Sequence, residues 1–237
     1  MEEELKKLNL PKDFKLVITG GGRVGKGAIE VIAKTNIQKV SPEDFLNKEF
    51  NFPVYTQLDV KDYVSRDDDK SFDKSAFFND PVGHSSTFMK YAKVADLYVA
   101  CHYWDNRSPF IFTRKDMLDP NWKISVVADV SCDIDGPVAC TLRPSTIANP
   151  FYGYDPHSQK EVDFHYEKSI GVMAVDNLPC ELPKDASTEF GKMFIDHVLE
   201  PLTGNDPENI IYRASETIDG KLTHQFEYLK DYLDGKD

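Results

Sequence analysis

Short apolar runs alternate with stretches of helical period along most of the chain. Four runs rich in Val, Ile, Leu and Ala predict buried strands, at residues 15–19, 96–101, 124–129 and 169–176. Apolar positions that recur every three or four residues predict helices at about 24–34, 186–200 and 223–233. Strands that alternate with helices in this way indicate an α/β protein with a mostly parallel central sheet.

The first apolar run leads directly into a glycine-rich turn. Gly20, Gly22 and Gly25 stand in G-x-G-x-x-G spacing, between the first strand and the first long helix. This order of strand, turn and helix opens a dinucleotide-binding fold, although a plain glycine-rich turn is the simpler alternative. Gly20 would make the tight turn, Gly22 would let the backbone approach a pyrophosphate, and Gly25 would let helix and strand pack closely. Arg23 and Val24 complete the predicted phosphate site, at the helix N-terminus.

The predicted fold is therefore a Rossmann-like, doubly wound parallel sheet flanked by helices. Residues 47–90 have the least regular pattern and are expected to form an insertion or a lid, with one more strand suggested at Val54 and Tyr55. The expected organisation is a connector helix at 1–13, a nucleotide-binding domain at 14–183 and a C-terminal helical return segment at 184–237.

The residue that binds the adenosine ribose is harder to place. A dinucleotide site usually has an acid ~20 residues after the glycines. Glu43 and Asp44 lie at that distance, but Ser41 is a good N-cap for a helix whose first turn favours acids in any case. Ser41 itself follows a short candidate strand at 36–40 and is an equal candidate to face the adenosine. The sequence therefore leaves NAD and NADP as alternatives.

Two later strands also end in groups suited to a nucleotide pocket. The strand at 96–101 ends in Cys101 and leads to Tyr103, and the strand at 124–129 ends in Asp129. Ligands of doubly wound sheets bind outside the carboxyl ends of the strands, so these three residues are candidate contacts. Two alternatives stay open: the aromatic side chain covers the core, and the aspartate makes hydrogen bonds within its own turn.

Composition excludes several classes of function. The net charge is −12 and the pI is near 5.0, which argues against nucleic-acid binding and against an anionic membrane surface. No apolar run approaches the ~18 residues of a spanning helix, and the N-terminus has no signal-peptide pattern. The four cysteines form no C-x-x-C pair, which favours reduced thiols in a cytoplasmic enzyme and no metal site.

Four blocks of sequence carry a family resemblance. They are residues 20–28, the Cys-His-Tyr-Trp at 101–104, the Asp-Val-Ser-Cys-Asp at 129–133, and Asp-Asn-Leu-Pro-Cys-Glu-Leu-Pro-Lys-Asp-Ala-Ser at 176–187. Together they resemble the lysine-forming saccharopine dehydrogenase family and, equally, the lysine–ketoglutarate reductase half of the bifunctional lysine-degrading enzyme. Both belong to the wider alanine dehydrogenase and transhydrogenase group. The resemblance runs from about residue 13 to the C-terminus, and the last block is its most specific part.

The resemblance implies an activity and a set of site residues. Members of the family interconvert saccharopine with lysine and 2-oxoglutarate, and they transfer a hydride to or from NAD or NADP. The implied cofactor contacts are Gly20, Gly22 and Gly25 at the pyrophosphate, Cys101 and Tyr103 in the nucleotide pocket, and Asp176 with Leu178 at the nicotinamide end. The ribose-binding acid of the family has no clear match at the end of the second strand.

The chain departs from the family before the glycine turn. Family members have a whole domain there, which supplies a lysine and a histidine as acid and base, whereas here only residues 1–14 precede the first strand. We therefore expect the cofactor-binding part of a longer enzyme, acting on a small amino-acid substrate together with a missing N-terminal catalytic domain or partner chain. A non-catalytic nucleotide-binding or regulatory module, and an alanine dehydrogenase-like enzyme with another substrate, are the alternatives.

The C-terminal helices are expected to lack their usual packing partner. In the family they pack on the missing first domain, and here they carry Phe190, Phe194, Phe226 and Tyr232. An apolar patch of this kind is expected to favour a homodimer.

Overall fold

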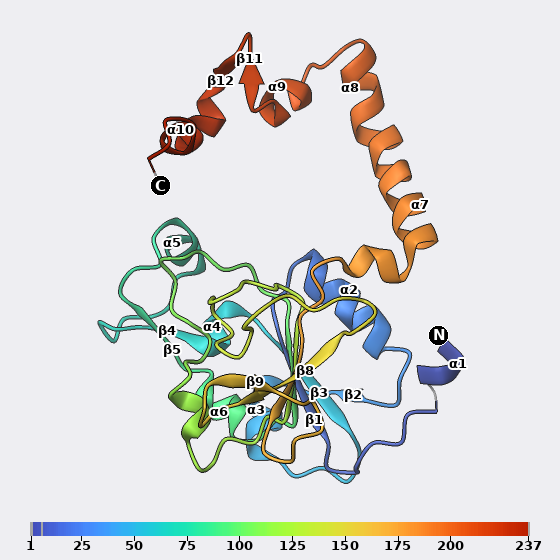
Figure 1. Cartoon of the computed structure of the whole chain (residues 1–237), viewed down its shortest axis with the longest axis vertical. Helices are drawn as coiled ribbons and strands as arrows, with labels where there is room; N and C mark the ends of the chain where they lie inside the picture. The colour runs from blue at the N-terminus through green and yellow to red at the C-terminus, as the bar shows by residue number, and fades with distance from the viewer. Residues whose placement is uncertain (1, 6, 237) are drawn as a thin grey trace. The chain divides into compact units, whose positions relative to one another are not determined.

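The computed structural model describes residues 2–5 and 7–236, so residues 1, 6 and 237, which include parts of the predicted connector helix, lie outside the described residues. The chain forms two compact units, Met1–Asn177 and Leu178–Asp237 (Figure 1). None of the helices in the described part of the chain is long and apolar enough to cross a membrane.

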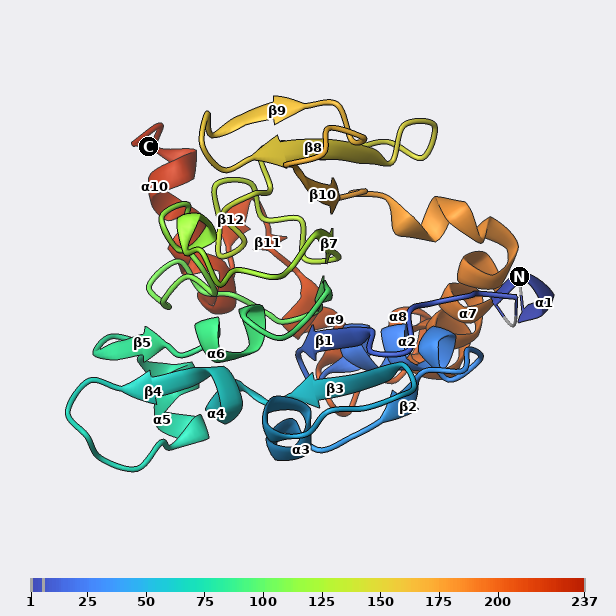
Figure 2. The ribbon, with the colours of Figure 1, turned by 90° about the horizontal axis from the view of Figure 1, so that it is seen from below.

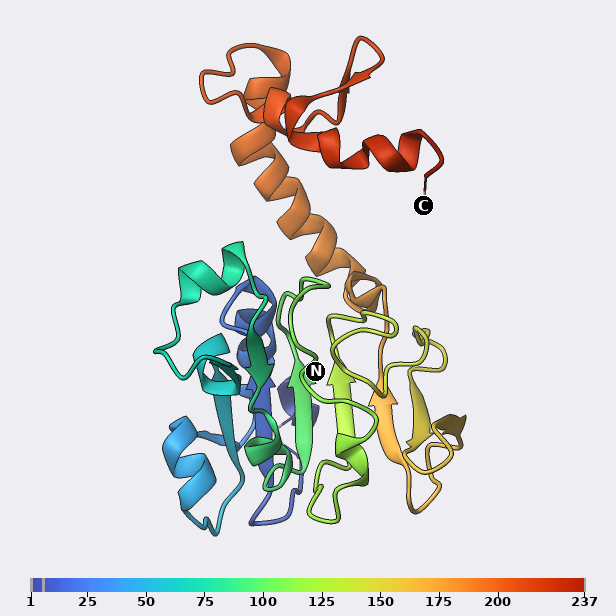
Figure 3. The same ribbon diagram turned by 90° about the vertical axis from the view of Figure 1, so that its left-hand side faces the viewer.

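The first unit is organised around one sheet, which in the described residues has eight strands in the order β2-β3-β1-β6-β7-β10-β8-β9. The strands from β2 to β10 in this order are parallel, and β8 and β9 extend the edge in antiparallel pairing (Figures 2 and 3). Their bounds are β1 Lys15–Thr19, β2 Gln38–Lys39, β3 Val54–Leu58, β6 Leu97–Ala100, β7 Val126–Asp129, β8 Phe151–Asp155, β9 Lys160–Val162 and β10 Ile170–Met173. The prediction of a Rossmann-like, doubly wound sheet is confirmed.

Alternating side chains of the strands build a core on each face of this sheet. In β1, Val17 joins the larger core, whereas Leu16 and Ile18 join the smaller one, because successive side chains of a strand point to opposite faces. The smaller core is completed by Ile32 of α2, and the larger one by Phe45 of α3. The helices of this unit are α1 Glu2–Leu5, α2 Arg23–Ile32, α3 Pro42–Asn47, α4 Val60–Tyr63, α5 Lys74–Asn79, α6 Met89–Ala92 and the 3₁₀ helix η1 Asp116–Leu118.

Strand β3 corrects the expected organisation of residues 47–90. The strand suggested at Val54 and Tyr55 is present as β3, but it belongs to no separate insertion or lid, because it pairs directly with β1 in the middle of the parallel sheet. The candidate strand at 36–40 is only the two-residue β2, at the edge beyond β3. The pattern of β3 is weak because Thr56 and Gln57 interrupt its apolar positions. The rest of the segment holds α4, α5, α6 and a hairpin of β4 Val64–Arg66 with β5 His84–Ser86.

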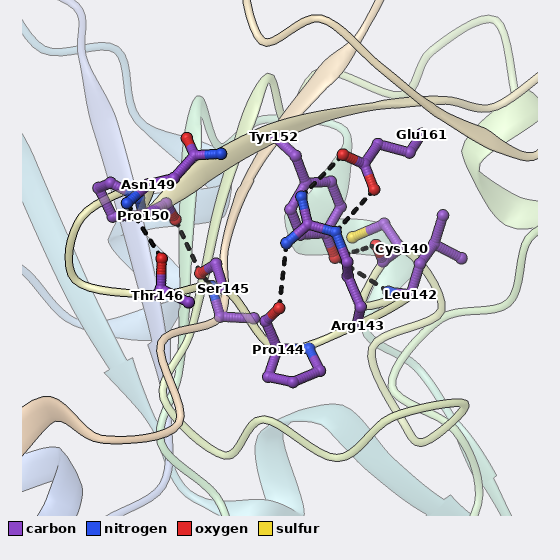
Figure 4. Close-up of polar contacts among 11 residues, drawn as sticks. Cys140, Leu142, Arg143, Pro144, Ser145, Thr146, Asn149, Pro150, Tyr152 and Glu161 are labelled. Carbon is purple, nitrogen blue, oxygen red and sulfur yellow. Dashed lines mark hydrogen bonds and ion pairs between the residues drawn. The ribbon is translucent and has the colours of Figure 1, made fainter.

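A set of polar contacts fixes the loop that leads into the antiparallel edge (Figure 4). Arg143 of the loop forms a two-fold ion pair with Glu161, at 2.7 Å for both nitrogen–oxygen pairs, and lies 4.7 Å from the centroid of the Tyr152 ring. The Tyr152 hydroxyl donates to Cys140 O and accepts from Leu142 N. These contacts hold the loop after β7 against β8, and so stabilise the sheet on the side of β7 and β10.

The second unit is mainly helical. Residues 183–203 are continuously helical, as α7 Pro183–Phe194, the π-helical turn η3 Ile195–Leu199 and α8 Glu200–Thr203. After them come α9 Ile210–Ala214, the hairpin of β11 Thr217–Ile218 and β12 Lys221–Leu222, the 3₁₀ helix η4 His224–Leu229 and α10 Lys230–Leu233. The predicted helices at 186–200 and 223–233 are thus present. Phe190 and Tyr232 are exposed, and the homodimer expected from such residues stays a prediction.

Candidate functional site

The glycine turn after β1 can form only with glycine at two of its positions. Gly20 has a φ of +97°, and a Cβ there would lie 2.3 Å from Cys101 O. A Cβ on Gly25 would lie 2.1 Å from Gly20 O, so helix α2 can approach the turn only because no side chain is present. The turn is held from the neighbouring strand, because Gly20 N donates to Leu58 O and Gln57 Nε2 donates to Gly20 O.

Gly22 differs from Gly20 and Gly25 because a side chain at this position would meet no other atoms. It is the N-cap of α2, no side chain caps this helix end, and nothing lies within 4 Å of a Cβ built on it. The first N–H groups of a helix have no partner within the helix, and the open space at the Cβ position of Gly22 leaves room beside them for an anion, which the helix dipole also favours. The turn thus combines a rigid shape with room for a phosphate group.

A cavity of about 810 Å³ lies against this turn, at the carboxyl ends of β1, β3 and β6. A volume of this order is large enough for a nucleotide cofactor. Its walls are the glycine turn, the end of β3 with the helix α4 that follows it, part of α5, and the segment after β6. Its lining residues include Gly22, Asp59, Tyr63, Lys74, His102 and Tyr103.

The structure brings together about half of the site residues predicted from the sequence. Gly20, Gly22, Arg23, Val24, Cys101 and Tyr103 line the cavity, and Gly25 packs against Gly20 at its base. Ser41, Asp129 and Asp176 are not among the lining residues. Asp176 is exposed beyond the carboxyl end of β10, and Leu178 begins the second unit in the 3₁₀ helix η2 Leu178–Glu181.

Ser41 has a local structural role. Its hydroxyl accepts from Asp44 N and caps α3, which follows the edge strand β2. One of the two strands beside β1 is β3, and the acid at the end of β3 is Asp59, which lines the cavity. The ~20-residue spacing rule missed Asp59 because this acid comes 39 residues after Gly20. The sequence signal that marks it is an acid placed directly after the apolar end of a strand.

Asp59 is held in place by its own helix and by α5. Its carboxylate accepts from Val60 N and forms a capping box with Asp62 at the start of α4. Lys74 of α5 donates to both carboxylate oxygens, at 2.8 and 2.9 Å. Partial burial opposes ionisation, but the hydrogen bonds from Lys74 and Val60 outweigh it and lower the pKa of Asp59 below its ordinary value. The group is therefore a carboxylate at neutral pH, with acceptor atoms at the cavity wall.

Asp129 is a buried structural acid. Only 1% of it is exposed, and its oxygens accept from Ser131 N, Cys132 N and the Thr141 hydroxyl. Burial raises the pKa of this carboxyl above its ordinary value, against the effect of these hydrogen bonds. The contacts shape the turn after β7, and they match the alternative in which this aspartate makes hydrogen bonds within its own turn.

Cys101 and His102, the two residues directly after β6, are both neutral at pH 7. Burial lowers the pKa of His102 to about 4 and, together with the nearby Asp129, raises the pKa of the Cys101 thiol to about 11. Cys101 is therefore a thiol rather than a reactive thiolate. No group of three or more His, Cys, Asp or Glu side chains that could hold a metal ion occurs among residues 2–5 and 7–236.

The burial of His102 predicts a pH dependence of stability. Its pKa falls from 6.5 in the unfolded chain to about 4 in the fold, so the unfolded chain binds more protons between these values. The contribution of the neutral imidazole is fully present above pH 6.5 and is lost as pH falls through about 4. We expect wild type to lose up to about 3 kcal/mol of unfolding free energy relative to His102→Gln between about pH 7 and about pH 4. Urea unfolding of both proteins measures this difference, and parallel pH profiles would contradict it.

Comparisons with known proteins agree with the fold. No family model matches the chain. A solved L-alanine dehydrogenase structure aligns over 93% of this chain and 53% of its own, with a TM-score of 0.51 and 16% sequence identity, and it supports the fold alone.

Similar sequences occur among curated proteins. The chain is 27% identical to alpha-aminoadipic semialdehyde synthase of Arabidopsis thaliana over 90% of its length, and 28% identical to the mitochondrial protein of that name from Rattus norvegicus, again over 90%. It covers 22% and 26% of these two proteins. It is also 30% identical to the saccharopine dehydrogenase [NAD(+), L-lysine-forming] of Schizosaccharomyces pombe, over 44% of this chain and 27% of that protein. The chain is therefore a homologue of alpha-aminoadipic semialdehyde synthase and of lysine-forming saccharopine dehydrogenase, similar to a part of each.

Proposed function

We propose that the chain is the cofactor-binding part of an NAD(P)-dependent oxidoreductase that acts on saccharopine. The observation that carries the proposal is the cavity at the carboxyl ends of β1, β3 and β6, with an uncapped helix N-terminus at Gly22 and a carboxylate at Asp59. These are the two recognition features of a dinucleotide site, one for the pyrophosphate and one for the adenosine ribose. The saccharopine dehydrogenases among the homologues support the substrate class.

The residues of this chain fit a dinucleotide in two places. The backbone N–H groups at the start of α2 would bind the pyrophosphate, because Gly22 leaves the approach open. Asp59 would accept hydrogen bonds from the ribose hydroxyls, and it would compete with a ribose 2′-phosphate for the Lys74 ammonium with which it forms an ion pair. We therefore propose NAD rather than NADP as the cofactor. Asp176, exposed beyond the end of β10, is proposed for the nicotinamide end. Once bound, the nicotinamide ring would carry the hydride.

Replacing Asp59 by asparagine tests the ribose assignment. Asparagine is as good an N-cap as aspartate, so α4 should keep its start. The loss of a charged acceptor should weaken NADH binding roughly tenfold, because hydrogen bonds to charged groups contribute about 1.5–3 kcal/mol. NADPH binding should weaken less or improve, since the competition of Asp59 with the 2′-phosphate for Lys74 is removed. Calorimetric titration of wild type and variant with both cofactors measures the change in preference.

An equal loss for NADH and NADPH in Asp59→Asn would contradict the ribose assignment. Asp62→Asn is the matched control, because Asp62 belongs to the same capping box but does not line the cavity. The control should leave the preference between the two cofactors unchanged.

The oxidoreductase reaction needs an acid and a base, and neither His102 nor Cys101 in the cavity is suited to that task near pH 7. The His102 imidazole and the Cys101 thiol stay neutral at pH 7, because their pKa values are about 4 and about 11. This observation favours acid–base groups from a further domain or partner chain, and it also supports the alternative of a nucleotide-binding module without chemistry.

Saccharopine-dependent reduction of NAD⁺ separates these two functions. It is measured with the purified chain, alone and mixed with the part of the Arabidopsis thaliana homologue that precedes the matching region. Turnover in either case, abolished by Gly22→Asp in this chain, would establish the oxidoreductase. Cofactor binding without turnover in both cases would support the regulatory alternative.

A further inference from the structure

A chain of three buried polar side chains runs beneath the cavity, between β1 and β6. The Tyr98 hydroxyl lies 2.8 Å from Thr19 Oγ1, and the same oxygen lies 2.9 Å from His102 Nδ1. Tyr98 and Thr19 are fully buried, and His102 is only 8% exposed. At the upper end of this chain, His102 Nε2 is buried and has no hydrogen-bond partner among the described residues, although His102 lines the cavity.

The protons of this chain can be placed by counting donors and acceptors. In the described part of the protein, the Tyr98 hydroxyl has Thr19 Oγ1 as its hydrogen-bond partner and no other. Its proton therefore has an acceptor only if Tyr98 donates to Thr19. The Thr19 proton is then free to go to His102 Nδ1, which must be an unprotonated acceptor. This is the one arrangement in which both hydroxyl protons are used, and it places the imidazole proton on Nε2.

The imidazole can keep this tautomer because it stays neutral. Burial lowers the pKa of His102 to about 4, so a second proton does not bind near pH 7. The cavity wall therefore contains a fixed, uncharged N–H donor that has no acceptor among the described residues. A buried donor without a partner costs about 1–3 kcal/mol, and a ligand that supplies an acceptor would recover part of this cost.

The position of His102 indicates which half of a dinucleotide it would meet. Its ring contacts Thr19 at the end of β1, and it lies edge-on to Tyr63 with 6.4 Å between the ring centroids. Tyr63 belongs to α4, the helix that Asp59 caps, so His102 and Asp59 line the same part of the cavity although β6 and β3 lie on opposite sides of β1. In a dinucleotide site the ribose-binding acid marks the adenosine half.

We infer that His102 is a specificity-determining residue, whose Nε2–H donates a hydrogen bond to an acceptor atom of the adenosine half of the nucleotide. Thr19 and Tyr98 are positioning residues, because they fix the imidazole tautomer without reaching the ligand. The inference rests on the proposed function, since it needs a nucleotide in the cavity. His102 would thus add an uncharged hydrogen-bond donor to the two recognition features already described, the helix N-terminus and the Asp59 carboxylate.

The test compares His102→Phe with His102→Gln in the whole chain. Phenylalanine keeps a ring against Tyr63 but has no donor, whereas glutamine can place an amide N–H near the position of Nε2. Calorimetric titration with ADP and with NADH should show His102→Phe weaker than wild type by roughly five- to tenfold for both ligands, the range of one neutral hydrogen bond. His102→Gln should recover most of the loss. The fold-change should be the same for both ligands, because they share the adenosine half.

Nitrogen-15 NMR of the imidazole gives a readout that a merely structural role would not change. The spectrum should show His102 protonated on Nε2 in wild type, with that resonance shifted by ADP, and a mixture of tautomers in Tyr98→Phe. A proton on Nδ1 in wild type would overturn the inference. Equal affinity of wild type and His102→Phe for ADP would also overturn it, while NADH binding by wild type would leave the proposed function intact. Failure of wild type to bind either ligand would overturn both.

Discussion

Replacing Gly25 by alanine is expected to lower the free energy of unfolding by about 3 kcal/mol or more, because overpacking against backbone atoms cannot be relieved by a side-chain rotation. The new Cβ would lie 2.1 Å from Gly20 O, and the residues on both sides of this contact are fixed in α2 and in the turn. Relief requires α2 to move away from the turn, which also displaces the helix N-terminus. NADH affinity should therefore fall together with stability.

Gly27→Ala is the matched control, because Gly27 lies two positions further along the same helix. Nothing lies within 4 Å of a Cβ at this site. Alanine there should raise the unfolding free energy by about 1 kcal/mol, the usual gain over glycine inside a helix. Urea unfolding of the two variants gives changes of opposite sign. A Gly25→Ala protein as stable as wild type would contradict the close packing of helix and turn.

Replacing Gly22 by aspartate is expected to abolish cofactor binding while the fold is kept. Gly22 is the N-cap of α2 with an extended backbone and free space around its Cα. Aspartate is a preferred N-cap residue, so the unfolding free energy should stay the same or rise by a few tenths of a kcal/mol. The new carboxylate would occupy the anion site, and repulsion from a pyrophosphate at contact distance is worth about 4 kcal/mol near a protein surface. NADH affinity should fall roughly a hundredfold or more.

Gly22→Asn separates charge from bulk in this experiment. Asparagine has nearly the same shape and caps a helix equally well, but it adds no negative charge. It should weaken NADH binding clearly less than aspartate does. Unchanged NADH affinity in a folded Gly22→Asp protein would show that the pyrophosphate is not bound at this helix end.

Four of the parallel strands could be predicted because each has an apolar pattern that is visible within its own few residues. β1, β6, β7 and β10 are continuous apolar runs, as expected for parallel strands buried on both faces. The glycine turn could be predicted because each glycine has a specific local task. The steric tasks of Gly20 and Gly25 are visible as the contacts that a Cβ would make.

The ribose side of the site could not be predicted, because it depends on whether β2 or β3 lies beside β1. A strand of two residues, β2, comes next in the sequence, but β3 takes the inner position. No local sequence pattern shows that β3 and not β2 lies next to β1. The usual ~20-residue spacing after the glycines therefore pointed to Ser41, Glu43 and Asp44 as the residues near the ribose. Asp59 became a candidate only when the pairing of β1 with β3 placed it at the cavity.

The role of His102 was also out of reach of the sequence. Its hydrogen-bond partner is Thr19, at the end of β1, and Thr19 is in turn bonded to Tyr98 of β6, the strand that precedes His102. The Cys-His-Tyr-Trp segment indicated polar and aromatic groups at a strand end, but not which of them would be buried. Tyr103 is 83% exposed, whereas His102 beside it is buried and neutral.

Titration of the purified chain with NADH tests the central claim most directly. The site geometry predicts one binding event per chain, tighter for NADH than for NADPH because Asp59 competes with a 2′-phosphate for Lys74. Gly22→Asp, examined in the same calorimeter at the same protein concentration, should show no binding. If wild type gives no binding heat with NADH, NADPH or ADP, the assignment of the cavity beside Gly22 as a dinucleotide site is contradicted.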